Sequence, residues 1–523
     1  MTGLVTQSGN WRALSRNTVL NLAGGLVPSL VAIVAIPYTL HGMGVERFGI
    51  LSLYWVAFGY FAVVDLGLAR AVTNFVAEAL GRDDEERVVN VVWTALALQL
   101  VLSALGSVVL ALGSQLIFDR FLVLSPGLRQ EAKSSFHLLC MAIPIITCAN
   151  TLRGILEAGQ RFDLVNTVRI LSTSSAFMLP ALAVYLGFGL RGTTALLVGS
   201  LLCTAVGSLL LCFRVYPYLK RRLSFQRELL RPLFTYGGWV TLSGILIPFL
   251  VSSDRLLLGS MVSVAALGIY TVPAEMAARL QVLPGSLTAT LFPAFSMSAA
   301  SRKEVGAVYA RGLTFSLLLL GPATLLGVVL APQILRLWVG GQVAVQGALV
   351  LQVLVIGRFL NALSQTPASL LDGLGKPDLR AKVFFVFAPI YLALAWYCIR
   401  RYGALGAAAA WGLRSAGELI VFLAVASHQV GAYGASPTER RMLLRFGGLA
   451  AFAMVAPLPI VFWSHGITTQ TICALAATAL FVYALWRWVL SDAERLGAWA
   501  MLSRLTPLRL RTDNRAALGV DDV

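Results

Sequence analysis

Charged residues are scarce in this chain of 523 residues. Asp, Glu, Lys and Arg together make up 12% of it and apolar residues make up 58%, whereas about a quarter of the residues of a soluble globular chain are charged. Apolar stretches of about 20 residues recur along the sequence, and a helix of that length crosses a hydrocarbon core of roughly 30 Å. The alternating segments of about 10 residues that are typical of membrane β-barrels are missing. The composition therefore predicts an all-α polytopic membrane protein.

Sequence signatures of catalysis, metal binding and disulfides are missing as well. The chain has no Walker A motif, no H-E-x-x-H and no G-x-S-x-G, and the Gly-Lys pair at 375–376 is followed by Pro377. The six cysteines all lie in apolar runs without a C-x-x-C pair, and the four histidines lack the spacing of metal ligands. We therefore expect no enzyme activity, no cofactor and no bound metal.

Fourteen apolar segments are long enough to be membrane-spanning helices. We place them, to within a few residues, at 17–39, 48–69, 90–113, 135–157, 164–187, 192–213, 233–254, 266–290, 307–330, 345–371, 379–399, 404–427, 442–463 and 468–490. The loops between them are short, and the longest one on the outer side covers about 114–134. The chain therefore has no room for a separate catalytic or nucleotide-binding domain.

The distribution of positive charge predicts the orientation in the membrane. A net charge of +17 would suggest nucleic acid binding in a soluble protein, but in a membrane protein Lys and Arg gather in cytoplasmic loops. An even number of spans places both termini on one side. With the N-terminus inside, 25 of the 41 Lys and Arg residues fall in cytoplasmic segments and 8 in outer loops. We therefore expect a protein of the cell inner membrane with both termini in the cytoplasm and no nucleic acid partner.

The first twelve spans form two similar sets of six. FGILSLYWV (48–56) resembles LGIYTVPAE (267–275), LEAGQRFDL (156–164) resembles LDGLGKPDL (371–379), and GLRGTTAL (189–196) resembles GALGAAAA (403–410), with offsets of 219, 215 and 214 residues. Three matches in the same order at nearly constant offset indicate an internal duplication. Because six is an even number, the two halves share one orientation and are parallel repeats.

The duplication predicts five parts of the chain. They are a six-helix bundle (1–215), a cytoplasmic linker (216–232), a second six-helix bundle (233–430), two additional helices (431–490) and a basic cytoplasmic tail (491–523). We expect a cleft between the two bundles. The polar phrases LEAGQRFDL and LDGLGKPDL are interpreted as turns in which Asp caps the next helix, and not as binding sites.

Arginines within the spans are the first candidates for a binding site. A charge at mid-bilayer costs at least about 2.5–3.5 kcal/mol and usually faces a partner or a wet cavity. Arg279, Arg358 and Arg414 lie deepest, and Arg358 has no acidic residue within one helical turn, which makes it the strongest candidate for contacting an anion. Glu275 and Arg279 are four residues apart, as are Arg414 and Glu418. Each pair shares a helix face, and it either lines a cavity or neutralises itself.

Arg70 is a further candidate, although its place near a cytoplasmic helix end also permits its side chain to reach the interface. Arg153, Arg169 and Arg311 lie near cytoplasmic helix ends in the same way, and Arg255 lies near the outer end of the seventh span.

Acidic residues in or near the spans are candidates for ion coupling. Asp65, Asp254 and Asp372 could carry a proton or a sodium ion, as buried carboxylates do in transporters. The alternative is pairing with arginine, because Asp65 lies five residues before Arg70 and Asp254 directly precedes Arg255.

The chain resembles a known family of transporters. The segment NLAGGLVPSLVAIVAIPYTLHGMGVERFGI, followed by VVDLGLARAV, by LRGILEAGQRFD and by a glycine turn before an Ala-rich helix, is similar to the Wzx-type polysaccharide flippases of the MATE-like (MOP) superfamily. The resemblance covers roughly residues 15–430. It implies two six-helix bundles around a cationic central cavity, to which Arg279, Arg358 and Arg414 would contribute.

The same resemblance implies a function. The protein would be a flippase that carries an undecaprenyl-diphosphate-linked oligosaccharide, a repeat unit of O-antigen, capsule or exopolysaccharide, to the outer leaflet by alternating access. Its partners would be this lipid-linked oligosaccharide, the bilayer, and assembly proteins such as a glycan polymerase. Arginine suits a diphosphate because its planar fork makes bidentate, charge-assisted hydrogen bonds.

Three alternatives stay open at this point. The first is a MurJ-like flippase for lipid II. The second is a MATE-type cation-coupled drug exporter, whose cavity would favour carboxylates and aromatic residues over arginine. The third is an integral-membrane glycan polymerase or ligase, which would need a larger outer loop than this chain has.

Overall fold

The computed structural model describes residues 8–65, 67–235, 246–298, 302–430, 437–463, 466–489 and 495. Within these ranges the chain is helical and contains no strand. The middle of the predicted seventh span and the basic tail at 491–523, except for Arg495, lie outside the described residues.

The N-terminal half consists of long helices. They are α1 (Ser8–Met43), α2 (Val45–Val64), α3 (Leu68–Leu80), α4 (Glu85–Leu116), α5 (Pro126–Ala158), α6 (Phe162–Tyr185) and α7 (Leu190–Val215), with a π-helical turn, η1 (Ile117–Phe121), after α4.

The linker follows as two 3-10 turns, η2 (Pro217–Lys220) and η3 (Arg227–Leu229). It packs on α4, where the Trp93 indole N–H donates to the carbonyl oxygen of buried Leu219 (3.1 Å) and the Thr94 hydroxyl accepts from the N–H of Gln226 (2.9 Å). These bonds attach the linker to the N-terminal half.

The C-terminal half continues the helical pattern. Its helices are α9 (Leu246–Met261), α10 (Val264–Arg279), α11 (Val282–Ser298), α12 (Arg302–Val329), α13 (Ala331–Trp338), α14 (Gly341–Gly373), α15 (Pro377–Val430), α16 (Pro437–Val455), α17 (Pro457–Trp463) and α18 (Ile467–Trp488). Helix α15 covers the predicted spans 379–399 and 404–427. Between them, Gly403 has φ 56° and ψ −130°, a conformation that suits glycine because it has no Cβ.

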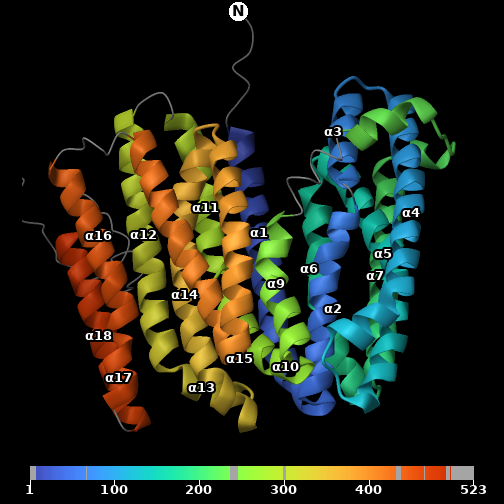
Figure 1. The fold of residues 1–523 in the computed structure, drawn as a ribbon. Coiled ribbons are helices and arrows are strands. Elements are labelled where there is room, and N and C mark those ends of the chain that lie inside the picture. Colours follow the sequence, from blue (N-terminus) through green and yellow to red (C-terminus); the bar gives the residue numbers. More distant parts are fainter. Residues whose placement is uncertain are drawn as a thin grey trace, which may run out of the picture.

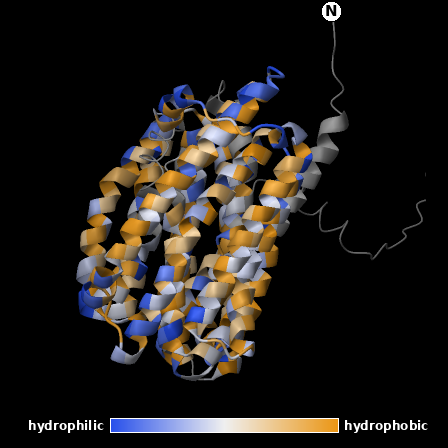
Figure 2. Ribbon diagram, turned by 90° about the vertical axis from the view of Figure 1, so that its right-hand side faces the viewer, coloured by the Kyte–Doolittle hydropathy of each residue, from blue (hydrophilic) through white to orange (hydrophobic). Residues whose placement is uncertain are grey.

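The helices run side by side in two groups (Figure 1). Helices α2 to α7 form one group and α9 to α15 lie in the other, with α16, α17 and α18 packed on α12 at its outer edge. Hydrophobic residues cover most of the length of the helices, and hydrophilic residues gather towards the two ends of the bundle (Figure 2). Nine helices of the described part are long and apolar enough to cross a membrane. Their length and composition are those of a multi-pass membrane protein.

Nine such helices are compatible with the fourteen predicted spans. Helix α15 counts once but contains two of them. The seventh span is described only in part, as α9, and the thirteenth is divided into α16 and α17. The second span of each half is also divided.

The expectation of one continuous helix over 48–69 is wrong. Helix α2 ends before Asp65, and α3 begins after Gly67, whose φ is 67°. The Asp65 carboxylate accepts a hydrogen bond from the N–H of Ala69 (3.2 Å) in the first turn of α3. The apolar pattern continues across this break, so hydropathy did not mark it, whereas a capping Asp and a left-handed Gly stabilise it.

The expectation of one continuous helix over 266–290 is wrong for a related reason. Helices α10 and α11 are separated by Leu280 and Gln281. The side-chain amide of Gln281 donates to the carbonyl oxygen of Arg358 (3.4 Å) and to the Asn361 side chain (3.3 Å) on α14. This break lies near the position that the offset of 219 residues predicts from the break in the first half.

The two similar polar phrases fold into the same turn. The N–H groups of Arg161 and Lys376 each donate to the carbonyl oxygen five residues earlier, both at 2.9 Å. Each follows a residue with positive φ, namely Gln160 (55°) and Gly375 (72°). In the first turn, Arg161 pairs locally with Asp163 (3.1 Å). The interpretation of these phrases as turns between helices is confirmed.

Helices α2 and α10 join the two halves of the chain. A Cβ added at Gly49 would overlap with the carbonyl oxygen of Val264, and one added at Gly268 would overlap with the carbonyl oxygen of Val45. The contact is reciprocal, because Val45 and Gly49 correspond to Val264 and Gly268 at the predicted offset of 219 residues. Two glycines are therefore required for the backbones to come this close.

Replacing Gly268 by Ala should weaken this contact. The added methyl meets backbone, which cannot rotate away, and we expect a loss of about 1–3 kcal/mol in the free energy of unfolding. The measurement is thermal unfolding of the purified protein in detergent. Gly113→Ala is the control, since its Cβ would meet no atom within 4 Å, and it should unfold at or above the parent temperature. Equal unfolding temperatures for the two variants would contradict the packing argument.

Candidate functional site

A group of seven charged side chains lies inside the C-terminal half. We call it the central charge cluster. It consists of Asp254 and Arg255 on α9, Glu275 and Arg279 on α10, Arg358 on α14, and Arg414 and Glu418 on α15. Four arginines face three carboxylates, so the cluster has one net positive charge when all are ionised.

Glu275 joins two arginines. Its carboxylate accepts hydrogen bonds from Arg255 (2.9 Å) and from Arg279 one turn along the same helix (3.0 Å). The Arg255 and Glu275 side chains are 15% and 13% exposed. Beside them, buried Asp254 accepts a hydrogen bond from the hydroxyl of Tyr270. With Asp254 beside them, two carboxylates face Arg255 and Arg279 on this side of the cluster.

Arg414 and Glu418 form a pair one turn apart on α15, with Nε and Oε1 separated by 3.3 Å. Their side chains are only 5% and 2% exposed. The guanidinium carbon of Arg414 lies 4.7 Å from the ring centre of Tyr391 and 5.5 Å from that of Trp411. A cation over an aromatic face is stabilised electrostatically, so this pair is neutralised and tightly held.

Arg358 differs from the other arginines of the cluster. Within the described residues it makes no ion pair; its guanidinium carbon lies 4.2 Å from the ring centre of Trp411, and its Nε is buried without a hydrogen-bond partner. It lies within electrostatic range of Asp254, Arg255 and Glu275. A buried guanidinium without its own carboxylate favours the binding of an anion.

The cluster extends to the N-terminal half through Arg279. Its guanidinium carbon lies 5.1 Å from the ring centre of Phe177 on α6. Phe177 packs in turn on Trp55 of α2, whose indole N–H donates to the carbonyl oxygen of Ala176 (3.2 Å). From the sequence, an anion site is expected between the two halves. The structure instead places the charges inside the C-terminal half, with Arg279 at the contact with the N-terminal half.

Both pairs predicted from a spacing of four residues, Glu275–Arg279 and Arg414–Glu418, are confirmed. The suggested pairing of Asp254 with its neighbour Arg255 is wrong. Adjacent residues do not face each other on a helix, and Arg255 reaches Glu275 on the next helix instead.

The suggested pair of Asp65 and Arg70 is also wrong. Asp65 is buried in the N-terminal half, where it caps α3 and lies against the side-chain amide of Gln99 (2.8 Å). Arg70 is exposed and makes no ion pair within the described part of the chain. Asp372 pairs with Arg380 at the turn between α14 and α15. These three candidates are therefore separate from the central charge cluster.

The role of Arg255 and the aromatic residues of the cluster are not evident from the sequence. Arg255 looks like an arginine that reaches the membrane interface, because its partner Glu275 lies 20 residues away. The spacing of Trp411 is informative, since it precedes Arg414 by three residues and therefore shares its helix face. No sequence pattern points to Tyr391, because it meets Arg414 only after α15 bends at Gly403.

Removing the shared carboxylate should destabilise the protein strongly. In Glu275→Gln, Arg255 and Arg279 lose their counter-charge, and we expect a loss of about 3–5 kcal/mol in unfolding free energy. The matched control is Glu157→Gln, which also removes the carboxylate of an Arg–Glu pair four residues apart, with side chains 40% and 39% exposed. That loss should be about 1 kcal/mol or less. Unfolding in detergent measures both, and similar losses would rule out a buried charge requirement at Glu275.

Comparison with known proteins places the chain in a family. Residues 14–299, more than half of the chain, match the family described as "Polysaccharide biosynthesis protein". The chain is 28% identical over 403 residues to a protein of Shigella flexneri named "Putative O-antigen transporter", covering 77% of this chain and 95% of that protein. It is 26% identical over 345 residues to the membrane protein EpsK of Bacillus subtilis, covering 62% and 65% of the two chains.

Solved structures share the fold. A multidrug resistance MATE family transporter of the MOP superfamily, in an inward-facing conformation, matches with a TM-score of 0.68 at 16% identity, over 79% of this chain and 98% of that one. The lipid II flippase MurJ, in an inward closed conformation, matches with a TM-score of 0.68 at 11% identity, over 90% and 98%. At such identities the likeness establishes the fold alone. The chain is therefore a membrane protein of the polysaccharide biosynthesis protein family, with the fold of the MOP-superfamily transporters.

Proposed function

We propose that this protein is an inner-membrane flippase for a lipid-linked oligosaccharide. Its substrate is a polysaccharide repeat unit, of O-antigen, capsule or exopolysaccharide, on undecaprenyl diphosphate. The family match and the relative named as an O-antigen transporter support the polysaccharide part of this proposal. The central charge cluster supports the anionic part, since a diphosphate carries about two negative charges near neutral pH.

Arg358 is the observation that carries the proposal. It is the arginine of the cluster that makes no ion pair within the described residues, and its guanidinium carbon lies 4.2 Å from the ring centre of Trp411. Arg279, a quarter exposed and at the contact with the N-terminal half, provides a second guanidinium. Bidentate hydrogen bonds from two such groups suit the oxygens of a diphosphate.

Translocation of the head group across the membrane requires a charged site of this kind. Taking a charged diphosphate and a polar glycan through hydrocarbon without compensating hydrogen bonds is prohibitively unfavourable. A charged interior replaces the lost hydration of the head group, while the polyisoprenoid tail stays in lipid. The protein then needs no chemical step and no cofactor to move the head group.

Alternating access would proceed by movement of the bundle 1–215 against the bundle 233–430. The α2–α10 contact joins them, and the linker 216–232 moves with the first bundle because it is hydrogen-bonded to α4.

Both termini lie in the cytoplasm in this proposal. Asp65, buried in the N-terminal half, is the candidate for a coupling proton or sodium ion, and a glycan polymerase is the expected partner on the outer side.

Replacing Arg358 by Ala should reduce export at least about tenfold. Losing a charge-assisted hydrogen bond costs about 1.5–3 kcal/mol, which corresponds to such a factor. The measurement is surface polysaccharide in a strain whose own copy is deleted and replaced by the variant, with protein amount in the membrane determined in parallel. Arg358→Lys should retain part of the activity, because it keeps the charge and loses the planar guanidinium fork.

The control for this experiment is Arg82→Ala. Arg82 is 62% exposed and pairs with Glu78 (2.9 Å), away from the central charge cluster, so export should stay at the parent level. Normal export by Arg358→Ala at equal protein amount would refute its role in binding the head group.

A further inference from the structure

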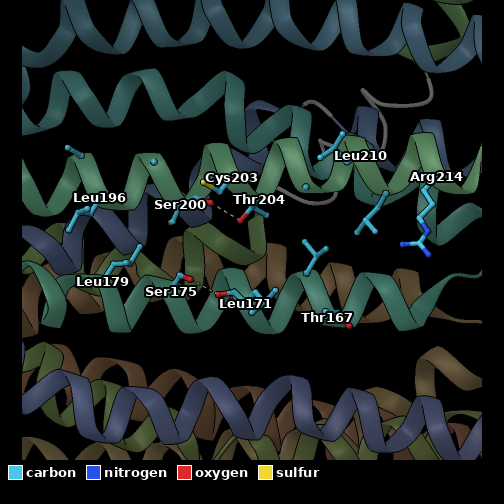
Figure 3. Close-up of a pocket in the computed structure, with 15 residues that line it drawn as sticks. Thr167, Leu171, Ser175, Leu179, Leu196, Ser200, Cys203, Thr204, Leu210 and Arg214 are labelled. Atoms are coloured by element: carbon cyan, nitrogen blue, oxygen red, sulfur yellow. Dashed lines mark hydrogen bonds between the residues drawn. The ribbon is translucent and has the colours of Figure 1, made fainter. Parts of the chain in front are cut away.

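A groove of about 860 Å³ lies between α6 and α7, away from the central charge cluster (Figure 3). Helix α7 contributes a row of small residues four positions apart, namely Ala195, Gly199, Cys203 and Gly207. A row of this kind normally lets another helix pack closely. Here the space remains open, because a Cβ added at Gly199 or Gly207 would meet no atom within 4 Å.

The groove is apolar although several of its residues are polar. The hydroxyls of Ser175, Ser200 and Thr204 each donate to a carbonyl oxygen of their own helix, all at 2.8 Å. Figure 3 shows two of these bonds along the helices. Because each of these hydroxyls already donates its hydrogen within its own helix, it has no donor left for a sugar. The groove therefore suits a hydrocarbon ligand.

The length of the groove matches one membrane span. From Leu196 to Arg214, α7 rises about 27 Å at roughly 1.5 Å per residue, close to the thickness of the hydrocarbon core of roughly 30 Å. A volume of about 860 Å³ over this length is less than a third helix, about 10–12 Å across, would fill. The groove therefore suits a thinner, chain-like ligand.

One end of the groove carries a positive charge. Arg214 is in the last turn of α7, is exposed, and extends from α7 at the end of the groove where Thr167 lies on α6 (Figure 3). Within the described residues it makes no ion pair. This is the end that the charge distribution places in the cytoplasm. An apolar groove that ends in a guanidinium is complementary to a hydrocarbon chain with a phosphate at its cytoplasmic end.

Helix α6 separates this groove from the central charge cluster. Ser175 and Leu179 line the groove, while Phe177 between them contacts Arg279. Residues two positions apart on a helix point to different sides. The same helix therefore has an apolar groove on one side and a cationic site on the other, so the groove is a separate site.

We propose that the α6–α7 groove captures the polyisoprenoid chain of the lipid carrier on the cytoplasmic leaflet, with Arg214 at its phosphate. This inference rests on the proposed function and assigns its tail-binding site.

Filling the groove tests the proposal. In the double variant Gly199→Leu/Gly207→Leu, two side chains extend into the groove from positions where an added Cβ would meet no atom within 4 Å. The dissociation constant of undecaprenyl phosphate is measured by native mass spectrometry on the purified full-length protein. We expect it to rise at least about tenfold, because the loss of two buried CH₂ groups already suffices for that. Gly113→Leu on α4, which also meets no atom within 4 Å, should leave it unchanged.

Two further variants separate the charge from the chain. Arg214→Ala should weaken the binding of undecaprenyl phosphate several-fold and leave the binding of uncharged undecaprenol unaffected. Arg191→Ala, which removes an exposed arginine at the opposite end of the same helix, should bind undecaprenyl phosphate like the parent. This pattern would support the proposal.

Other outcomes overturn the proposal in distinguishable ways. Equal binding by the parent and the filled groove would reject the groove and leave the flippase proposal intact. If the parent protein does not bind undecaprenyl phosphate, undecaprenyl phosphate is rejected as the lipid carrier as well. Displacement by equimolar phosphatidylglycerol would make the groove a general lipid site. Loss of a dimer in the filled variant, visible in the same spectra, would make it an interface between two copies of the chain. The last two outcomes also reject a polyisoprenoid site.

Discussion

The contact between α2 and α10 is the constraint on which the rest of the structure depends. Two glycines, Gly49 and Gly268, bring the backbones of the two halves together, and one continuous hydrophobic core includes residues of both, such as Leu51 and Leu267. Glu275 lies two turns beyond Gly268 on the same helix. The packing that joins the halves therefore also sets the position of α10, and with it the position of the arginines that Glu275 holds.

Electrostatics explains why the charges of this chain gather as they do. In an apolar interior an isolated charge is too unfavourable to persist, so the arginines of the cluster have acquired carboxylates or aromatic faces. Glu275 serves two guanidiniums, and Glu418 serves one. Arg358 relies on Trp411. Within the described residues the cluster therefore keeps an imbalance of one positive charge.

Prediction of the site from the sequence succeeded where both partners lie on one helix. The pairs Glu275–Arg279 and Arg414–Glu418 follow from the helical repeat alone, and the turns at 156–164 and 371–379 follow from local polarity. It failed for Arg255 and for Tyr391, whose partners are set by packing between helices or by a bend. Hydropathy also overlooked the breaks after α2 and α10, because apolar residues continue through both.

The sequence by itself determined the class of protein, the approximate positions of the spans and the duplication of the halves. Hydropathy and repeat spacing are properties of the chain, and they need no knowledge of which helices meet. The tertiary structure alone decided that the charges form one cluster in the C-terminal half, that Arg358 makes no ion pair within the described residues, and that a groove stays open beside α6. These features depend on distances between helices far apart in sequence, which the packing of small residues such as Gly49 and Gly268 sets.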